Sequence, residues 1–405
     1  MSDNKKYKIL LVHNFYQLPG GEDTVFRNEK KLLEDNGHEV VTYTRDNSEL
    51  KRNILKKLLL PLVTIFNPKT YFEIKKIIKE QDIDIVHVHN TLCLISPSVF
   101  YAAVKMKRPV VQTLHNFRMQ CANGLFYRDG HICEDCISGG LKCALKHRCY
   151  RNSFLQTLAI VLMLKIHRFT GIYRKVNFIC LTEFNRNKLL LINNKKQIID
   201  EKRIFAKPNF VFEDNSSIVS NSDTDKKETI SNDKWYYLYV GRLDEIKGID
   251  IVLEAFSKMP ERELHVIGSG GEGYIKRYSR FNNIKLLGQL SHEEVMAETI
   301  NSKAMVFPSK LYEGMPMTVI ESFENGVPVI TSGIGNAKEM VKEGITGLYF
   351  ESGKVESLIS AIDKLDNLDI NTLKENAHME FRKKYTENVG YNNIINIYRK
   401  VIENN

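Results

Sequence analysis

The chain has 405 residues and a formal net charge of +9, with 43% hydrophobic and 26% charged residues. This length suffices for two domains with separate cores, and the composition is that of an ordinary globular protein. An integral membrane protein is not expected, because the longest apolar stretch, residues 154–166, is interrupted by Gln156 and Lys165 and is shorter than the ~20 residues of a spanning helix.

The first half is predicted to alternate strands and helices. Apolar strands are expected at residues 8–13, 39–44, 85–89, 110–114 and 178–181, and the first helix at about 24–36. Continuous apolar strands separated by helices are typical of a parallel sheet covered on both faces. Gly20 and Gly21 follow the first strand and would let a phosphate approach the backbone, although a plain tight turn uses the same residues.

The charge of this half is strongly basic. Residues 1–210 hold 35 Lys and Arg against 19 Asp and Glu, whereas residues 211–405 hold 23 against 30. The imbalance suggests an anionic partner for the first half, and an ordinary lysine-rich surface is the alternative. Two basic-apolar stretches, residues 51–69 and 148–175, would suit an anionic membrane surface, but buried helices with basic rims would look the same.

A loop-rich segment, residues 117–150, contains four cysteines spaced C-x11-C-x2-C-x12-C: Cys121, Cys133, Cys136 and Cys149. In a reducing cytoplasm this spacing favours a structural zinc ion over disulfides. Cys143 falls among them, and His131 or His147 could replace one sulfur ligand. Redox use and unliganded thiols are the alternatives. Cys93 and Cys180 lie in apolar surroundings and are predicted to be core residues.

Residues 213–233 are polar and rich in Ser, Asn and Asp, which predicts a loop near a domain junction. A second series of strands follows at residues 235–240, 263–267, 284–287, 305–307 and 328–331. We therefore expect an N-terminal domain at 1–207, a linker at 208–234, a C-terminal domain at 235–387 and a final helical segment at 388–405.

Two cations follow the first strand of the second half. Arg242 and Lys247 lie in a glycine-punctuated loop before a predicted helix at 249–258. This loop falls at the edge of the sheet where open α/β folds bind ligands. An arginine fork and a lysine point charge are together suited to a diphosphate.

Further along, Glu313 and Glu321 lie eight residues apart across a loop that opens into a helix, from Pro316 to about Asn325. A helix start is an anion-binding site, here formed by the backbone N–H groups of Met315, Met317, Thr318 and Val319. A ligand with a sugar at one end, a diphosphate in the middle and a ribose at the other end would fit between the carboxylates. Taken alone, the spacing is equally that of a solvated helix start.

In combination these motifs resemble the nucleotide-binding half of family 4 glycosyltransferases of the GT-B fold: GR with K five residues on, PS, YEG and E-x7-E. Residues 326–331 and 343–347 continue the resemblance, which covers most of residues 235–350. It implies two Rossmann-like α/β domains with parallel sheets that face each other across a cleft, and a last helix that returns to the first domain. It also implies a nucleotide-diphosphate sugar donor and transfer with retention, with no cofactor for catalysis.

The resemblance also implies roles for single residues. Glu313 would orient the hydroxyl groups of the donor sugar, and Glu321 would hold the ribose. The segment Val110–Asn116 looks like the family's strand-end histidine motif, which would place His115 over the donor sugar. A glycine loop at Gly270 would approach the diphosphate. A bacterial polysaccharide-type subset of the family carries a similar cysteine-bearing insertion, whose role the resemblance does not give.

We therefore expect a cytoplasmic hexosyltransferase-type enzyme that moves a sugar to a glycan or lipid-linked acceptor in cell-surface polysaccharide synthesis, with peripheral association at the inner face of the membrane as the alternative location. No signal peptide is expected, because residues 1–8 are polar. The G-x-G-x-x-G pattern at 268–273 favours an NAD-dependent oxidoreductase instead, but it lies on the second strand of its domain, and no acidic residue ends the following strand. A nucleic-acid-binding protein is suggested by charge alone, so no nucleic-acid partner is expected.

Overall fold

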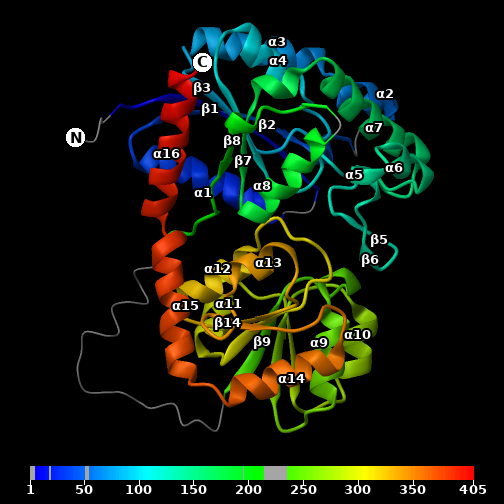
Figure 1. Ribbon diagram of the computed structural model, residues 1–405, viewed down its shortest axis with the longest axis vertical. Helices are drawn as coiled ribbons and strands as arrows, with labels where there is room; N and C mark the ends of the chain where they lie inside the picture. Colours follow the sequence, from blue (N-terminus) through cyan, green and yellow to red (C-terminus); the bar gives the residue numbers. More distant parts are fainter. Residues whose placement is uncertain (1–4, 18–19, 51–53, 195, 214–234) are drawn as a thin grey trace. The chain divides into compact units, whose positions relative to one another are not determined.

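The computed structural model describes residues 5–17, 20–50, 54–194, 196–213 and 235–405, without the side chains of residues 54–58. The chain divides into two compact units (Figure 1). The first comprises residues 1–128, 133–209 and 388–405, and the second comprises residues 129–132 and 210–387. Each unit is built on its own six-stranded sheet.

All strand pairs of the first sheet are parallel, in the order β2-β1-β3-β4-β7-β8. The strands are β1 (Lys8–Phe15), β2 (Glu39–Asp46), β3 (Ile85–Val88), β4 (Val110–Leu114), β7 (Asn177–Cys180) and β8 (Ile204–Ala206). The inner strand β1 is buried on both faces, because Leu10 and Val12 enter one hydrophobic cluster and Ile9 and Leu11 enter another. The predicted parallel sheet with two covered faces is confirmed.

Helices on both faces supply these two clusters (Figure 1). The helices of this unit are α1 (Gly21–Asp35), α2 (Ile54–Ile65), α3 (Pro68–Glu80), α4 (Ser98–Lys105), α7 (Phe154–Phe169), α8 (Glu183–Leu190) and α16 (Glu387–Glu403), with short 3-10 turns η1 (Asn47–Leu50), η2 (Ile172–Lys175), η3 (Leu191–Asn193) and η4 (Glu201–Arg203). The apolar side of α16, including Ile394 and Tyr398, packs in the cluster that contains Ile9. The C-terminal helix therefore completes the core of the first unit.

Helix α1 begins at Gly21, three residues earlier than expected. The reason is a local cap, in which the backbone N–H of Gly20 donates to Asp23 Oδ2 at 3.0 Å. Gly20 has an extended backbone with φ of −139°, so it is the capping position rather than part of a left-handed turn.

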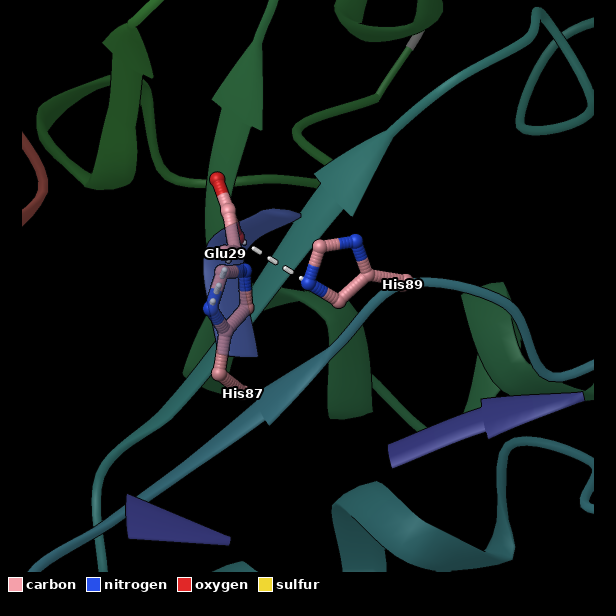
Figure 2. A group of neighbouring side chains, drawn as sticks. All are labelled: Glu29, His87 and His89. Carbon is pink, nitrogen blue, oxygen red and sulfur yellow. Dashed lines mark ion pairs between the residues drawn. The ribbon is translucent and has the colours of Figure 1, made fainter. Parts of the chain in front are cut away.

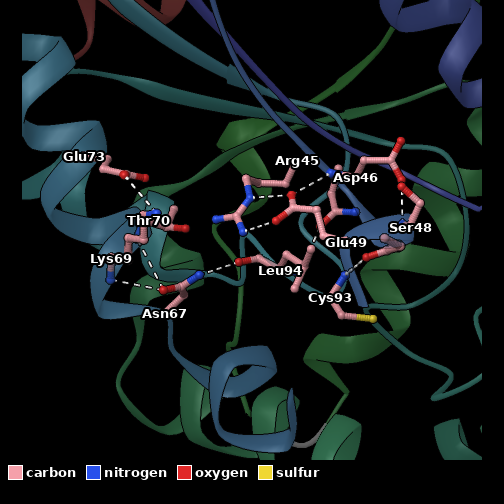
Figure 3. Close-up of polar contacts among 12 residues, drawn as sticks. Arg45, Asp46, Ser48, Glu49, Asn67, Lys69, Thr70, Glu73, Cys93 and Leu94 are labelled. Atoms are coloured by element: carbon pink, nitrogen blue, oxygen red, sulfur yellow. Dashed lines mark hydrogen bonds and ion pairs between the residues drawn. The ribbon is translucent and has the colours of Figure 1, made fainter. Parts of the chain in front are cut away.

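Polar contacts fix the loop that follows β3 (Figure 3). Asn67 caps α3 by accepting from the backbone N–H groups of Lys69 and Thr70, and its side-chain amide donates to the carbonyl of Leu94 at 2.5 Å. Nearby, the Arg45 guanidinium holds Glu49 with two bonds of 2.9 and 2.7 Å. The loop that follows β3 is thereby tied to the start of α3.

The cysteine-bearing segment is not a bare loop. It contains four short elements: β5 (Tyr127–Arg128), β6 (His131–Ile132), α5 (Asp135–Ser138) and α6 (Lys142–Lys146). Leu141 and Ala144 are buried with Ile160 and Leu164 of α7, which anchors the segment to the first unit.

The second sheet is also parallel, in the order β11-β10-β9-β12-β13-β14. Its strands are β9 (Tyr236–Val240), β10 (Glu263–Ile267), β11 (Ile284–Gly288), β12 (Ala304–Phe307), β13 (Val329–Thr331) and β14 (Gly347–Tyr349). Its helices are η7 (Glu245–Lys247), α9 (Ile249–Ser257), α10 (Glu272–Tyr278), α11 (His292–Asn301), α12 (Met317–Glu324), α13 (Gly335–Met340), α14 (Val355–Asp366) and α15 (Ile370–Lys384). Strands β8 and β14, of three residues each, were not predicted. Among the described residues, no helix has both the length and the apolar character needed to cross a bilayer.

Candidate functional site

The structure brings Lys247 and Glu313 into direct contact. Lys247 ends the 3-10 turn after β9, and Glu313 lies in the loop between β12 and α12. Lys247 Nζ is 2.7 Å from Glu313 Oε1, and the two side chains are only 26% and 14% exposed. Ser309 Oγ donates to the same Oε1 at 2.6 Å. The predicted site residues Lys247 and Glu313 therefore belong to one hydrogen-bonded group.

Close packing of two loops makes this contact. A Cβ on Gly248 would lie 2.1 Å from the carbonyl oxygen of Pro308, and the φ of Gly248 is +75°, so only glycine fits there. The backbone N–H of Lys310 donates to Ile246 O at 3.0 Å. These backbone contacts place Lys247 next to Glu313. The spacing of the sequence motifs alone did not predict this proximity.

Asn336 was not predicted and supports the same loop. Its side-chain amide donates to the backbone carbonyls of Glu313 and Gly314 from the start of α13. Ser332 Oγ donates to the carbonyl of Ser309 at 2.6 Å. The sequence signal for Asn336 and Ser332 is the glycine-rich segment that follows β13. Strand β13 ends at the same edge of the sheet as β12, where such folds bind ligands.

Arg242 lies in the same β9–α9 loop but faces solvent. Its side chain is 62% exposed, and its nearest ionic partner, Asp244, is 3.4 Å away. The loop itself is fixed, because the hydroxyl of Tyr239 donates to the carbonyl of Arg242 at 2.7 Å. A guanidinium on a fixed backbone with an exposed end is suited to a ligand anion.

The helix start that was predicted to bind an anion is present. Helix α12 begins at Met317 and continues through Thr318, and its N-cap is Pro316, which offers no side-chain cap. The prediction that Pro316 lies in the first turn is thus wrong by one position. The adjacent Met315 is buried. An uncapped first turn leaves backbone N–H groups for an anion.

Glu321 lies one turn further along α12. Burial raises the pKa of its carboxyl group, and the opposing influence of His292 is smaller. A half-buried carboxylate without a strong cationic neighbour is suited to accept hydrogen bonds from hydroxyl groups.

The glycine loop of the second sheet is packed against the Arg242 loop. A Cβ on Gly268 would lie 1.8 Å from the carbonyl oxygen of Gly241, and Leu243 N donates to Ser269 O at 3.0 Å. Gly270 stands beyond this contact, with open space around the position of a Cβ out to 3.9 Å. Close backbone packing thus accounts for part of the G-x-G-x-x-G pattern that suggested an oxidoreductase.

In the first unit, His115 follows β4 and contacts His89, which follows β3. His115 Nε2 is 3.1 Å from His89 Nδ1, and the rings are stacked with centroids 5.3 Å apart. Burial lowers the pKa of His115 well below its usual value, and His89 lowers it further. His115 is therefore a neutral imidazole at neutral pH.

Glu29 of α1 lies next to His87 and His89 (Figure 2). Glu29, His87 and His89 each place a ligand atom within 4.8 Å of the others, which makes them a candidate metal group. However, Lys207 Nζ is 2.5 Å from Glu29 Oε1 with both side chains fully buried, and the two ring nitrogens of His87 lie 2.7 Å from Tyr398 OH and 2.8 Å from Thr113 Oγ1. The carboxylate already has its cation and His87 has its partners, so the group is a hydrogen-bonded cluster rather than a metal centre.

At Gly20 and Gly21, where a phosphate was predicted to approach, the backbone is already part of a helix cap. The N–H of Gly20 donates to Asp23, whose other carboxylate oxygen is 2.7 Å from His13 Nε2. Gly21 is the first residue of α1. These two glycines therefore form a capped helix start, which is compatible with the tight turn that was weighed against a phosphate site.

The cysteine segment gathers three thiols around Cys136. Burial raises the pKa of Cys136 to about 12, and the neighbours that raise it further are Cys121, Cys149 and Cys143. Cys143, expected only as an extra thiol, thus belongs to the group, and its Sγ lies against Gly139. Cys133 is half-buried just after β6, and its N–H donates to Phe126 O at 2.8 Å. Among the described residues, no three of these sulfurs come within 4.8 Å of one another.

Two family models match the chain. One, described as Glycosyl transferases group 1, matches residues 220–388, and the other, Glycosyltransferase Family 4, matches residues 19–132. The chain belongs to the family 4 glycosyltransferases. The predicted family, the GT-B-like fold of two parallel sheets and the enzyme class are thereby confirmed, and the oxidoreductase and nucleic-acid alternatives are set aside.

Similar proteins agree with this assignment. An uncharacterized glycosyltransferase of Methanocaldococcus jannaschii is 24% identical over 94% of both chains. A lipopolysaccharide 1,6-galactosyltransferase of Salmonella typhimurium is 26% identical over 32% of this chain and 39% of its own length. Among solved structures, a glycosyltransferase from Rickettsia africae has a TM-score of 0.67 at 20% identity, covering 99% of this chain and 100% of the other. The HepE protein of Anabaena, solved with UDP-glucose, has a TM-score of 0.60 at 16% identity, covering 98% and 99%. The protein is a nucleotide-sugar-dependent glycosyltransferase.

Proposed function

We propose that the protein is a retaining hexosyltransferase that transfers a sugar from a nucleotide-diphosphate donor to a glycan or lipid-linked acceptor in cell-surface polysaccharide synthesis. The observation that carries the donor part is the Lys247–Glu313 pair at 2.7 Å beside the start of α12. A cation for a diphosphate and a carboxylate for sugar hydroxyls then meet within one hydrogen-bonded group.

The reaction breaks the bond between the anomeric carbon and the diphosphate oxygen, and the electron pair leaves with the phosphate. Lys247, Arg242 and the first turn of α12 stabilise the negative charge that develops on the departing group. The acceptor hydroxyl attacks from the same face and gives its proton to the leaving phosphate oxygen, so no separate general base is required. Transfer with retention rests on the family resemblance.

The carboxylates of Glu313 and Glu321 each contact a different part of the donor. Glu313, held by Lys247 and Ser309, orients hydroxyl groups of the sugar. Glu321 accepts the ribose hydroxyls. The family resemblance assigns His115 to the donor sugar. UDP is the first nucleotide to examine, because HepE was solved with UDP and with UDP-glucose.

A lipid-linked acceptor at the first unit is supported by its surface. Helices α2 and α7 pack together and carry exposed large apolar side chains: Leu59, Leu62, Phe154, Leu155, Leu162, Ile166 and Phe169. A cavity of about 410 Å³ beside them is lined by Leu60, Ala159, Ile160 and Arg151. The basic residues of the first stretch from Lys51 to Lys57 lie outside the residues whose side chains are described. Peripheral binding to an anionic membrane surface is part of this proposal.

A panel of nucleotide sugars tests the function. Purified enzyme is incubated with UDP-, GDP- and ADP-linked hexoses, with and without lipid-linked sugar acceptors, and release of nucleoside diphosphate is measured together with the product's anomeric configuration. We expect one donor to be used at least tenfold faster than the others and an acceptor-dependent product with retained configuration. An inverted product would contradict the mechanism, and no turnover with any donor would contradict the function.

We also propose that the thiols around Cys136 hold one structural zinc ion. The purified protein should contain about one zinc per chain, and Cys136→Ser should lose it together with stability, because a structural zinc contributes folding free energy. Comparing Cys133→Ser with Cys143→Ser identifies the fourth ligand, and Cys180→Ala, in the core of β7, is the control that keeps the metal. Metal analysis that finds no zinc in protein never exposed to chelator would refute the proposal.

A further inference from the structure

The cysteine segment holds one guanidinium group from both of its ends. Arg118 lies in the loop after β4, and its Nη1 donates to the carbonyl of Ala122 at 2.9 Å. A Cβ on Gly124 would lie only 3.1 Å from Arg118 Nη2, so a tight turn packs against the guanidinium. From the other end of the segment, the ring of Tyr150 has its centroid 5.4 Å from Arg118 Cζ.

A second guanidinium group contacts the same ring. Arg151 Cζ lies 5.5 Å from the centroid of Tyr150, and the Arg151 side chain is exposed. Cation–π contacts of this kind hold a guanidinium in place without neutralising it. The ion pairs formed within the described part of the chain include neither Arg118 nor Arg151. Two positive charges therefore lie beside one aromatic ring without a carboxylate partner.

The acidic side chains around Arg118 do not supply the missing negative charge. They are Tyr16, Glu22, Cys93 and Tyr150. Burial raises the pKa of all four groups, and that of Glu22 to about 8, so they are predominantly neutral at pH 7. Because a half-buried guanidinium without a counter-charge is costly, a bound anion would stabilise this arrangement.

A largely apolar cavity adjoins the two arginines. Its volume is about 410 Å³, within the ~300–1000 Å³ typical of small-molecule sites. Cys93, Tyr150 and Arg151 form part of its wall. Helices α2 and α7 contribute a further part through Leu60, Pro61, Thr64, Gln156, Ala159 and Ile160. The cavity thus combines a guanidinium with a mainly hydrocarbon wall.

The same two helices also expose apolar side chains. They pack against each other in the first unit (Figure 1). On α7, Leu155, Leu162 and Ile166 recur at helical spacing and are at least 39% exposed. On α2, Leu59 and Leu62 are more than half exposed. An exposed apolar surface of this kind is suited to a bilayer, so α2 and α7 contribute both to the cavity and to a membrane-binding face.

One class of ligand fits all of these features. We propose that Arg118, Tyr150 and Arg151 form a subsite for the diphosphate of a single-chain lipid, whose hydrocarbon chain next to the diphosphate occupies the cavity lined by α2 and α7. Two guanidinium groups match two phosphoryl groups, and a cavity of small-molecule size suits one chain. That this lipid carries the acceptor sugar rests on the proposed function, whereas the subsite itself does not.

The subsite also gives the cysteine segment a role. Cys121 precedes Ala122, whose carbonyl holds Arg118, and Cys149 precedes Tyr150. The fold of the segment around its thiols therefore places both guanidinium groups, in addition to stabilising the first unit.

Calorimetry with farnesyl diphosphate, a short single-chain lipid diphosphate, tests the subsite without any sugar donor. Inorganic diphosphate and farnesol present the head group and the chain separately. We expect farnesyl diphosphate to bind the wild-type protein at least tenfold more tightly than either, because each of them makes only part of the contacts. Inorganic diphosphate binding equally well would overturn the lipid part of the proposal, and farnesol binding equally well would overturn the diphosphate part.

Arg151→Gln is the decisive variant, because Arg151 is exposed and its loss should leave the fold intact. It should weaken farnesyl diphosphate binding about tenfold or more, the effect of losing a hydrogen bond to a charged group. Arg148→Gln is the matched control, since Arg148 is an exposed arginine of the same segment that does not line the cavity. Its affinity should stay within about twofold of the wild type. Equal losses in the two variants would indicate a general attraction to the basic surface and overturn the proposal.

Two further variants locate the chain and the head group. Ala159→Leu places bulk in the cavity wall and should reduce the affinity for farnesyl diphosphate toward that for inorganic diphosphate. Lys247→Met removes the cation of the donor site and should leave farnesyl diphosphate binding unchanged, although it impairs transfer. Binding that is lost in Lys247→Met but kept in Arg151→Gln would place the probe in the donor site and overturn the proposal.

These binding measurements use no nucleotide sugar, so they are independent of the proposed function. A protein that uses no nucleotide sugar, but binds farnesyl diphosphate through Arg151, would refute only the proposed function. Transfer to a lipid-linked acceptor at the wild-type rate and acceptor affinity in Arg151→Gln would refute only the subsite.

Discussion

Replacing Lys247 with methionine should separate catalytic from structural use of its charge. The substitution removes an ammonium 2.7 Å from Glu313 Oε1 and leaves the carboxylate with Ser309 as a donor at 2.6 Å. A hydrogen bond to a charged group is worth ~1.5–3 kcal/mol, and the remaining donor keeps the loss at the lower end. A preorganised charge donor at a leaving group is worth more, ~100- to 1000-fold in turnover.

The expected loss of stability and the expected loss of turnover differ enough for the assay to distinguish a structural from a catalytic role of Lys247. Even a protein with a stability of only ~5 kcal/mol would retain ~2 kcal/mol after the larger loss of ~3 kcal/mol and stay ~97% folded. Unfolding therefore cannot account for a 100-fold drop in rate. Turnover is measured as nucleoside diphosphate release at saturating donor, and stability by urea unfolding of the same preparations.

Lys310→Met is the matched control. Lys310 Nζ is 2.7 Å from Asp250 Oδ2, its side chain is 14% exposed, and it lies in the loop that carries Glu313. It should lose a similar amount of stability and keep its turnover within a few fold. Turnover of Lys247→Met within about threefold of the wild type would refute the leaving-group role, and so would recovery of the variant by added magnesium.

Three other predictions concern Glu321, Glu22 and the surface of the first unit. Glu321→Gln should weaken binding of the nucleoside diphosphate by ~1–3 kcal/mol in calorimetry, whereas Glu313→Gln should reduce turnover more than this affinity; an unchanged affinity in the Glu321 variant would count against ribose binding. Burial raises the pKa of Glu22 to about 8 from 4.5, with Asp23 adding to the effect, so the folded state keeps a proton that the unfolded chain loses, and stability should fall as pH rises between these values. In urea unfolding, the stability of Glu22→Gln relative to the wild type should increase by up to ~4 kcal/mol between pH 5 and pH 8. If the stability of both proteins depends on pH in the same way, the pKa of Glu22 is not raised. Binding to anionic lipid vesicles should fall steeply between low and high salt, and no sedimentation with vesicles at low salt would indicate a soluble acceptor.

The sequence was sufficient for the elements whose signal is local. The strands Val110–Leu114 and Glu263–Ile267 appear with the expected bounds, because short runs rich in aliphatic and β-branched residues identify strands locally. Helix α12 ends before Gly326, as the glycine signal predicts. The family motifs, most of which lie in residues 235–350, were likewise identified from the sequence alone.

Partners distant in the sequence were decided only by the tertiary structure. The separation of Lys247 and Glu313 in the sequence does not predict their contact, which depends on Gly248 lying against Pro308. Glu29 and Lys207 are 178 positions apart, and no local pattern identifies either as the other's counter-charge. A strand or a helix end is set by its own residues, whereas a buried charge is defined by whatever the fold places beside it, because inside the protein an unpaired charge is too costly to keep.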